Sequence, residues 1–169
     1  LYGVYSLLRM QAAGQVTVPL SVTEQPVYDL RILNHWDNLD GTVERGYAGC
    51  SLWNWEELPG TLSPRYEAYA RANASVGING TVLNNVNASP QVLATGSLEK
   101  VKALADVFRP YGIKVYLSVN FASPIQLGKL DTADPLDKEV IRWWRRKVKE
   151  IYTLIPDSVS YTHLRAHET

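Results

Sequence analysis

The chain has 169 residues, 46% of them hydrophobic, with 17 Lys and Arg against 17 Asp and Glu. This composition is that of an ordinary globular chain, and its zero net charge gives no reason to expect nucleic acid or an anionic membrane as a partner. No apolar run approaches the roughly 18 residues of a membrane span. The single cysteine, Cys50, excludes an internal disulfide, and we expect a half-buried thiol.

The first expected elements are a helix and a strand. Residues 1–14 repeat apolar side chains at helical spacing and end at a glycine, which is typical of a helix and its stop. Residues 15–27 contain two prolines and are expected to form a linker. Residues 28–33 are short and apolar, as expected of a strand. Residues 35–63 then form a long loop, and its aromatic side chains argue against disorder.

Two further strands and three helices follow this loop. A helix is predicted over 64–75, with a proline in its first turn, and a strand over 80–84. The next helix is predicted over 97–111 with Ser97 as its cap, and the next strand over 113–119.

The last predicted helix has the clearest pattern. It is expected over 134–155, with Asp134 as its cap and Pro135 in its first position. Trp143 and Trp144 fall within it, and we expect both to serve packing.

Alternation of strands and helices indicates an α/β fold with a parallel sheet and right-handed crossovers. A (β/α)₈ barrel and an open doubly wound sheet both fit this order. The chain has no GxGxxG after a strand, which weakens the dinucleotide-binding version of the second.

Asparagines open all three loops that follow the predicted strands. An amide both donates and accepts hydrogen bonds, so these side chains could bind neighbouring sugar hydroxyls, and they could equally brace the loop backbone. In a parallel barrel such loops form the active face. The candidate substrate-binding residues are Asn34, His35, Trp36, Asn84, Asn85 and Asn120.

Trp36 and His35 differ from the asparagines in what they can offer a ligand. Trp36 offers a flat apolar face for a sugar ring and one donor. His35 could be a base, a metal ligand or a hydrogen-bonded loop residue. No cysteine cluster accompanies it, so we expect no metal site, and sugar contact and loop bracing stay open.

Carboxylates are frequent in the first loop. Glycoside hydrolysis needs a carboxylic acid and a carboxylate on opposite sides of the scissile bond. We nevertheless expect the carboxylates of this loop to cap turns and fix its shape. They are Asp37, Asp40, Glu44, Glu56 and Glu57.

Three segments carry a resemblance to a known family. Residues 31–49, 52–59 and 80–87 closely resemble the microbial α-glucuronidases of glycoside hydrolase family 67, and the likeness extends over residues 1–157. It implies a partial (β/α)₈ TIM barrel with about the first three βα units in 28–157. Residues 1–14 would then be the last helix of a small N-terminal α/β domain.

The resemblance also implies a reaction. Such enzymes hydrolyse, with inversion and without a cofactor, the α-1,2 bond between (4-O-methyl)glucuronic acid and xylose in xylooligosaccharides. Trp36 and Val86 would lie in the uronic acid pocket, with Val86 beside the O-methyl group. The catalytic acid and base are expected downstream of Asp157, so we expect this chain alone to be inactive. The expected partner is a xylooligosaccharide carrying this uronic acid, and a homodimer of the parent protein is considered.

The C-terminal segment is different. Residues 159–169 match one reading frame of a transposase adapter used in sequencing libraries, and Ser158 fits the preceding bases. We therefore expect residues 158–169 to be an adapter-derived artefact and exclude them from the fold. That leaves His35 as the only native histidine, since His163 and His167 fall in this segment.

Two alternatives to a hydrolase stay open. A sugar isomerase would require metal-ligating histidines and carboxylates, which the segment before residue 158 does not provide. A stand-alone carbohydrate-binding or interaction module would bind xylooligosaccharide without cleaving it.

Overall fold

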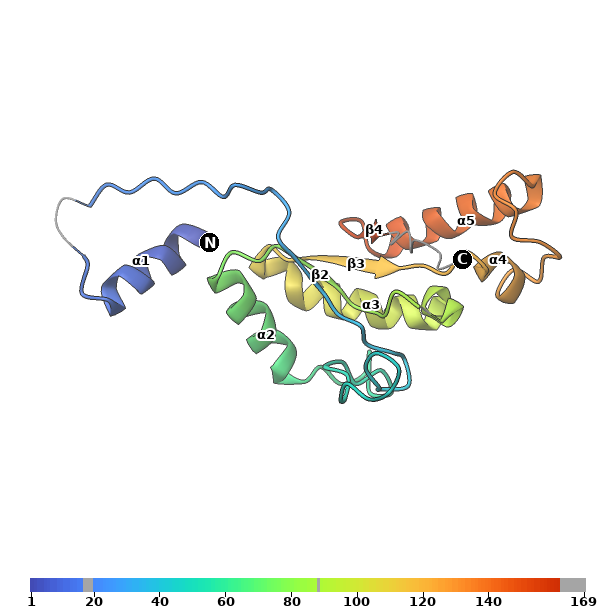
Figure 1. The fold of residues 1–169 in the computed structure, drawn as a ribbon, viewed down its shortest axis with the longest axis horizontal. Coiled ribbons are helices and arrows are strands. Elements are labelled where there is room, and N and C mark those ends of the chain that lie inside the picture. Colours follow the sequence, from blue (N-terminus) through green and yellow to red (C-terminus); the bar gives the residue numbers. More distant parts are fainter. Residues whose placement is uncertain (17–19, 88, 162–169) are drawn as a thin grey trace.

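The computed structural model describes residues 1–16, 20–87 and 89–161, with the backbone alone at 159–161. One parallel sheet has the order β1 (Ile32–Asn34), β2 (Gly80–Val82), β3 (Lys114–Ser118) and β4 (Val159–Tyr161). The helices are α1 (Tyr2–Ala12), α2 (Pro64–Ser75), α3 (Thr95–Phe108), α4 (Ser123–Gln126) and α5 (Lys138–Leu154), with 3₁₀ turns η1 (Pro90–Leu93) and η2 (Arg109–Tyr111). The predicted α/β class with parallel strands is confirmed. Figure 1 shows α3 running along β3, and residues 20–30 extended before the chain enters the sheet.

The first strand is shorter than predicted and begins later. The prediction covered 28–33, whereas β1 covers Ile32–Asn34. Before the strand, the side chain of Asn79 makes the hydrogen bonds that the backbone of a neighbouring strand would make. Its Nδ2 donates to Asp29 O at 2.6 Å, and its Oδ1 accepts from Arg31 N at 2.8 Å. These side-chain contacts hold the segment in place without a strand ladder.

Helix α2 has the predicted bounds, because its start signals are unambiguous. Ser63 accepts a hydrogen bond from Arg65 N at 3.3 Å, and Pro64 occupies the first position, where its missing N–H costs nothing. Tyr66, Ala70 and Ala74 are buried and form the face that packs on the core.

Helix α3 begins before the predicted cap. Ser97 was expected to start it, but the helix starts at Thr95 with Ala94 as N-cap, so the prediction of Ser97 as cap is wrong. The extra turn is held by tertiary contact, since Thr95 Oγ1 donates to Glu150 Oε1 on α5 at 2.7 Å.

Helix α5 begins four residues after the predicted cap. Asp137 is the N-cap and accepts from Glu139 N at 2.8 Å and from Val140 N at 3.1 Å. Asp134, the predicted cap, accepts from Leu136 N at 2.9 Å through Oδ1 and from Asp137 N at 3.0 Å through its backbone oxygen, within a separate turn. Asp137 satisfies two N–H groups of the first turn, which explains why the helix starts there.

Removing the Asp137 carboxylate should therefore destabilise the fold. We expect Asp137→Ala to lower the free energy of unfolding by about 1 kcal/mol, the usual cost of a lost N-cap. Asp134→Ala serves as the matched control and should cost less. Urea unfolding of both variants checks this, and an equal loss in the two would contradict the assignment of the cap.

The core lies between the sheet and helices α2, α3 and α5. The long loop contributes to it as well: Trp53, Trp55 and Leu58 are buried among the helix and strand residues. Trp143 is buried in this core and Trp144 packs against it, which confirms the packing role predicted for both. Cys50 is exposed, contrary to expectation, because it lies at an isolated bridge to Thr42 away from the core.

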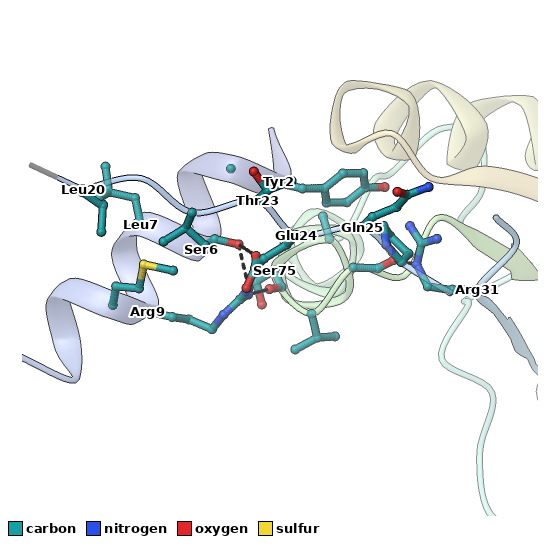
Figure 2. A pocket seen from close by; sticks show the side chains of 17 residues that line it. Tyr2, Ser6, Leu7, Arg9, Leu20, Thr23, Glu24, Gln25, Arg31 and Ser75 are labelled. Atoms are coloured by element: carbon teal, nitrogen blue, oxygen red, sulfur yellow. Dashed lines mark hydrogen bonds between the residues drawn. The ribbon is translucent and has the colours of Figure 1, made fainter. Parts of the chain in front are cut away.

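A cavity lies beside the amino ends of β1 and β2, where Arg31 and Gly77 contribute to its lining. Its volume is about 920 Å³, and it lies between α1, residues 20–26 and the end of α2. Figure 2 shows its polar centre, where Ser6 Oγ donates to Glu24 Oε2 at 2.7 Å and Arg9 binds Ser6 and the carbonyl of Ser75. These side chains bind one another and tie α1 to the remaining fold. The apolar side chains of α1 are exposed, among them Leu1, Val4, Leu7 and Leu8.

The fourth strand lies in the segment that we excluded from the fold. The backbone of Val159–Tyr161 pairs in parallel with Tyr116–Ser118 of β3. An unpaired strand edge is a template for any extended segment that reaches it, and valine and tyrosine favour strands. The adapter origin of residues 158–169 stays a prediction. His163 and His167 lie outside the described residues.

Within the described ranges, no helix is both long and apolar enough to cross a membrane.

Candidate functional site

The carboxyl ends of β1, β2 and β3 lie at the same edge of the sheet, because the strands are parallel. Asn34 is the last residue of β1 and is exposed. The hydrogen bond from His35 N to Val82 O, at 3.1 Å, carries the β1–β2 ladder one residue further. The predicted site residues are therefore brought to one edge, although their side chains do not all face the same way.

His35 faces the helices. Its Nε2 lies 2.7 Å from Tyr69 Oη on α2, and its ring packs edge-on against Trp53 with centroids 5.4 Å apart. Tyr69 Oη in turn lies 2.9 Å from Thr81 Oγ1 on β2. This arrangement makes His35 part of a hydrogen-bonded brace between the loop, α2 and β2.

Burial shifts the pKa values of His35 and Tyr69. Desolvation lowers the pKa of His35 below its ordinary value of 6.5, and Asp37, whose Oδ1 lies 3.8 Å from His35 Nδ1, partly opposes that shift. Burial raises the pKa of Tyr69 to about 12, so its hydroxyl keeps its proton. A neutral imidazole can accept from the Tyr69 hydroxyl through Nε2.

Asp37 fixes the first loop. Its side chain is only 3% exposed, and Oδ2 accepts from Ser51 Oγ at 2.7 Å and from Leu52 N at 2.9 Å. Its backbone oxygen accepts from Asn85 N at 2.8 Å. Asp37 therefore holds the middle of the first loop through its carboxylate and the second loop through its backbone oxygen.

Asn85 joins the first two loops. Its Nδ2 donates to Asn38 Oδ1 at 3.1 Å and to Glu44 O at 3.0 Å, and its Oδ1 accepts from Asn87 N at 2.9 Å. Asn38 Nδ2 donates to Glu44 O as well, at 2.9 Å. Both ends of the Asn85 amide are thus engaged by the protein itself.

Asn84 joins β2 to β3. Its Nδ2 donates to Ser118 O and its Oδ1 accepts from Ser118 N, both at 2.9 Å, so the side chain extends the sheet as a backbone would. Asn120, after β3, accepts from Ala122 N through Oδ1 at 2.8 Å and from Ser123 through its backbone oxygen. These contacts shape the turns at the edge of the sheet.

A cavity of about 340 Å³ opens between the first two loops. Trp36 and Val86 are half-buried at these loops. The Trp36 backbone oxygen accepts from Glu44 N at 2.9 Å, which holds the residue in the loop. The cavity is lined by Asp37, Asn38, Leu39, Asp40, Asn84, Asn85, Asn87, Ser89 and Val92.

The structure describes no group of three or more His, Cys, Asp or Glu side chains that could hold a metal ion within residues 1–16, 20–87 and 89–161. The edge offers amides, hydroxyls and one partly accessible indole, which suit hydrogen bonding and stacking to a sugar.

The histidine brace predicts a loss of stability in acid. The folded-state pKa of His35 lies below 6.5, so between these values the unfolded chain binds a proton that the folded chain does not. Its contribution is fully present above about pH 6.5 and is lost as pH falls through the folded pKa. We expect the free energy of unfolding to fall from pH 7 to pH 5, with a shallower fall in His35→Gln. Identical slopes in urea unfolding of the two proteins would contradict this.

Sequence reasoning missed Tyr69 and Thr81. Tyr69 follows Tyr66 by three residues on the predicted helix, so both lie on the same face, and this spacing could have indicated an inward-facing hydroxyl. The hydrogen bond between Tyr69 and His35 depends on how α2 packs against the first loop. No local sequence pattern predicts that packing.

Known proteins resemble this chain over nearly all of its length. Residues 10–167 match the glycosyl hydrolase family 67 middle domain. The chain is 45% identical to "Probable alpha-glucuronidase A" of Aspergillus clavatus and 46% identical to the protein of that name from Neosartorya fischeri, each over 95% of this chain and 19% of the relative. It is 43% identical to "Alpha-glucuronidase A" of Emericella nidulans, over 95% of this chain and 20% of that protein.

The chain therefore spans about a fifth of the length of the curated relatives that it matches. The family match covers well over half of the chain, and the identities exceed 40% across 95% of it. This chain belongs to glycosyl hydrolase family 67.

Proposed function

We propose that this chain is part of an inverting α-glucuronidase that removes (4-O-methyl)glucuronic acid from the xylose of xylooligosaccharides, in the degradation of xylan. The observation that carries the proposal is the 43–46% identity, over 95% of the chain, to proteins named as alpha-glucuronidases. The polar edge built by the loops after β1, β2 and β3 supports it, because sugar-binding sites need convergent hydrogen-bonding groups.

We further propose that the sheet is the first part of a (β/α)₈ barrel over residues 28–157, with α1 as the last helix of a preceding domain. The strand order supports this: β1, β2 and β3 are neighbours in chain order, and both pairs are parallel. A doubly wound sheet reverses its strand order at a switch point, whereas a barrel does not.

In this proposal Trp36 and Val86 grip the uronic acid. Both are half-buried at the ends of β1 and β2, where an indole face can stack on the ring and an apolar side chain can cover a methyl ether. Asn34 and Asn120 would contact sugar hydroxyls at the same edge. His35, Asn84 and Asn85 remain proposed substrate contacts, although the hydrogen bonds of their side chains to the protein support a bracing role.

Hydrolysis with inversion needs a general acid, a general base and a water molecule between them. The acid protonates the leaving xylose oxygen while the base deprotonates the attacking water. We place both groups downstream of Asp157. The proposed substrate is a xylooligosaccharide with a uronic acid branch. We also propose that the complete protein forms a homodimer.

An assay on aldouronic acids tests the function. The complete protein should release glucuronic acid from aldotriouronic acid without added metal, and the 169-residue chain should release none. A complete protein that binds aldotriouronic acid without cleaving it would favour a carbohydrate-binding module.

A further inference from the structure

Three consecutive residues at the end of β1 are each held by a different part of the fold. His35 is bound by Tyr69 of α2, and Asp37 is bound by Ser51 and Leu52 in the middle of the loop. Trp36, between them, is held through its backbone oxygen by Glu44 N. The backbone that carries Trp36 is therefore fixed on both sides of the residue.

The directions of the two flanking side chains determine where the indole lies. His35 Nδ1 and Asp37 Oδ1 are 3.8 Å apart, so both side chains lie on the same side of the backbone. His35 continues the ladder of β1, and successive side chains of an extended segment alternate between sides. The Trp36 side chain is thereby directed away from the helices, toward the opposite side of the sheet edge.

Tyr69 is the part of this system that lies outside the loop. It binds His35 Nε2 at 2.7 Å and Thr81 Oγ1 at 2.9 Å, so it ties the loop both to α2 and to β2. Ring contacts of Tyr69 with Trp53 and Phe108, with centroids 5.2 Å and 5.7 Å apart, fix the ring itself. A hydroxyl on a ring fixed in this way has one position, which is what a positioning contact requires.

We propose that Tyr69 is a positioning residue for substrate binding: through His35 it holds the backbone in the conformation that presents the Trp36 indole to the uronic acid. The role of Trp36 rests on the proposed function, whereas the coupling from Tyr69 to Trp36 does not.

The test uses two tyrosines of α2 in the complete protein. Tyr69→Phe removes only the hydroxyl, which binds both His35 and Thr81. Tyr66→Phe is the matched control: Tyr66 lies on the same helix, is 1% exposed, and its hydroxyl accepts from Asn54 N at 2.9 Å, away from His35. Each variant loses one hydroxyl from the same helix, so a difference between them reports the contacts of the Tyr69 hydroxyl with His35 and Thr81.

Kinetics on aldotriouronic acid give the first readout. We expect Tyr69→Phe to raise KM by about five- to tenfold with kcat within about twofold, because weaker uniform binding raises KM alone. Tyr66→Phe should leave both constants within about twofold of the parent. In a Trp36→Ala background the effect of Tyr69→Phe should vanish, since residues that act through one another are not additive. Equal KM values for the two phenylalanine variants, or an undiminished effect without Trp36, would overturn the proposal.

A second readout does not need catalysis. With 5-fluorotryptophan incorporated, the ¹⁹F resonance of Trp36, assigned by its loss in Trp36→Phe, should be a single line in the parent and in Tyr66→Phe. It should shift or broaden in Tyr69→Phe. An unchanged line in Tyr69→Phe would overturn the coupling. A protein that shows the expected ¹⁹F change but no hydrolysis would refute the proposed function alone.

Discussion

Replacing Trp53 with alanine is expected to lower the free energy of unfolding by about 3–5 kcal/mol, the usual cost of truncating a buried large aromatic residue. The Trp53 side chain is 1% exposed and packs against Tyr66 and Phe108 with ring centroids 5.8 Å and 5.6 Å apart. Its Nε1 donates to Leu83 O at 3.1 Å, so the substitution also leaves a buried carbonyl without this donor. Urea unfolding followed by circular dichroism measures the loss.

Tyr47 provides the control within the same loop. Its side chain is 75% exposed, and Tyr47→Ala should change the free energy of unfolding by no more than about 0.5 kcal/mol. A small loss in Trp53→Ala, similar to that in Tyr47→Ala, would mean that the loop can leave the core without unfolding the protein.

Replacing Trp36 with alanine is expected to lower kcat/KM of the complete protein on aldotriouronic acid by about 30-fold or more. Tryptophans that anchor a ligand contribute about 2 kcal/mol or more to binding, and 1.4 kcal/mol corresponds to a factor of ten. Trp36→Phe keeps a flat apolar face and should lose less. The exposed Tyr47 again serves as the control, since Tyr47→Ala should leave kcat/KM within about twofold.

The free energy of unfolding distinguishes the expected effect of Trp36→Ala from that of Trp53→Ala. Trp36 is only half-buried, so Trp36→Ala should unfold at a urea concentration close to that of the parent, unlike Trp53→Ala. If Trp36→Ala keeps full activity, the indole does not contact the substrate. If it loses activity and stability together, its role is structural.

Elements with strong local signals could be predicted from the sequence. Helix α2 has the predicted bounds because Ser63 and Pro64 define its start and no rival cap lies nearby. Helix α5 was placed four residues early because two aspartates compete, and only the folded helix reveals that Asp137 binds two N–H groups. The predicted strand over 28–33 began too early because the Asn79 side chain, far along the sequence, binds the backbone there.

The sequence predicts where the candidate site lies, but it does not predict which side chains contact one another there. Parallel strands bring their carboxyl ends together, so Asn34, Asn84 and Asn120 could be placed at one edge from the strand pattern alone. The partners of His35 and Asn84 could not be predicted, because Tyr69 and Ser118 meet them only through packing over more than 30 residues of intervening chain. Contacts of that kind leave no local pattern.

The most direct test of the proposed function is ¹H NMR of the anomeric region while the complete protein acts on aldotriouronic acid. A single displacement at the α-linked carbon inverts it, so the β-anomer of glucuronic acid should appear first and the α-anomer only as mutarotation proceeds. Initial release of the α-anomer would contradict the inverting mechanism, and the absence of any released uronic acid would contradict the assignment as an α-glucuronidase.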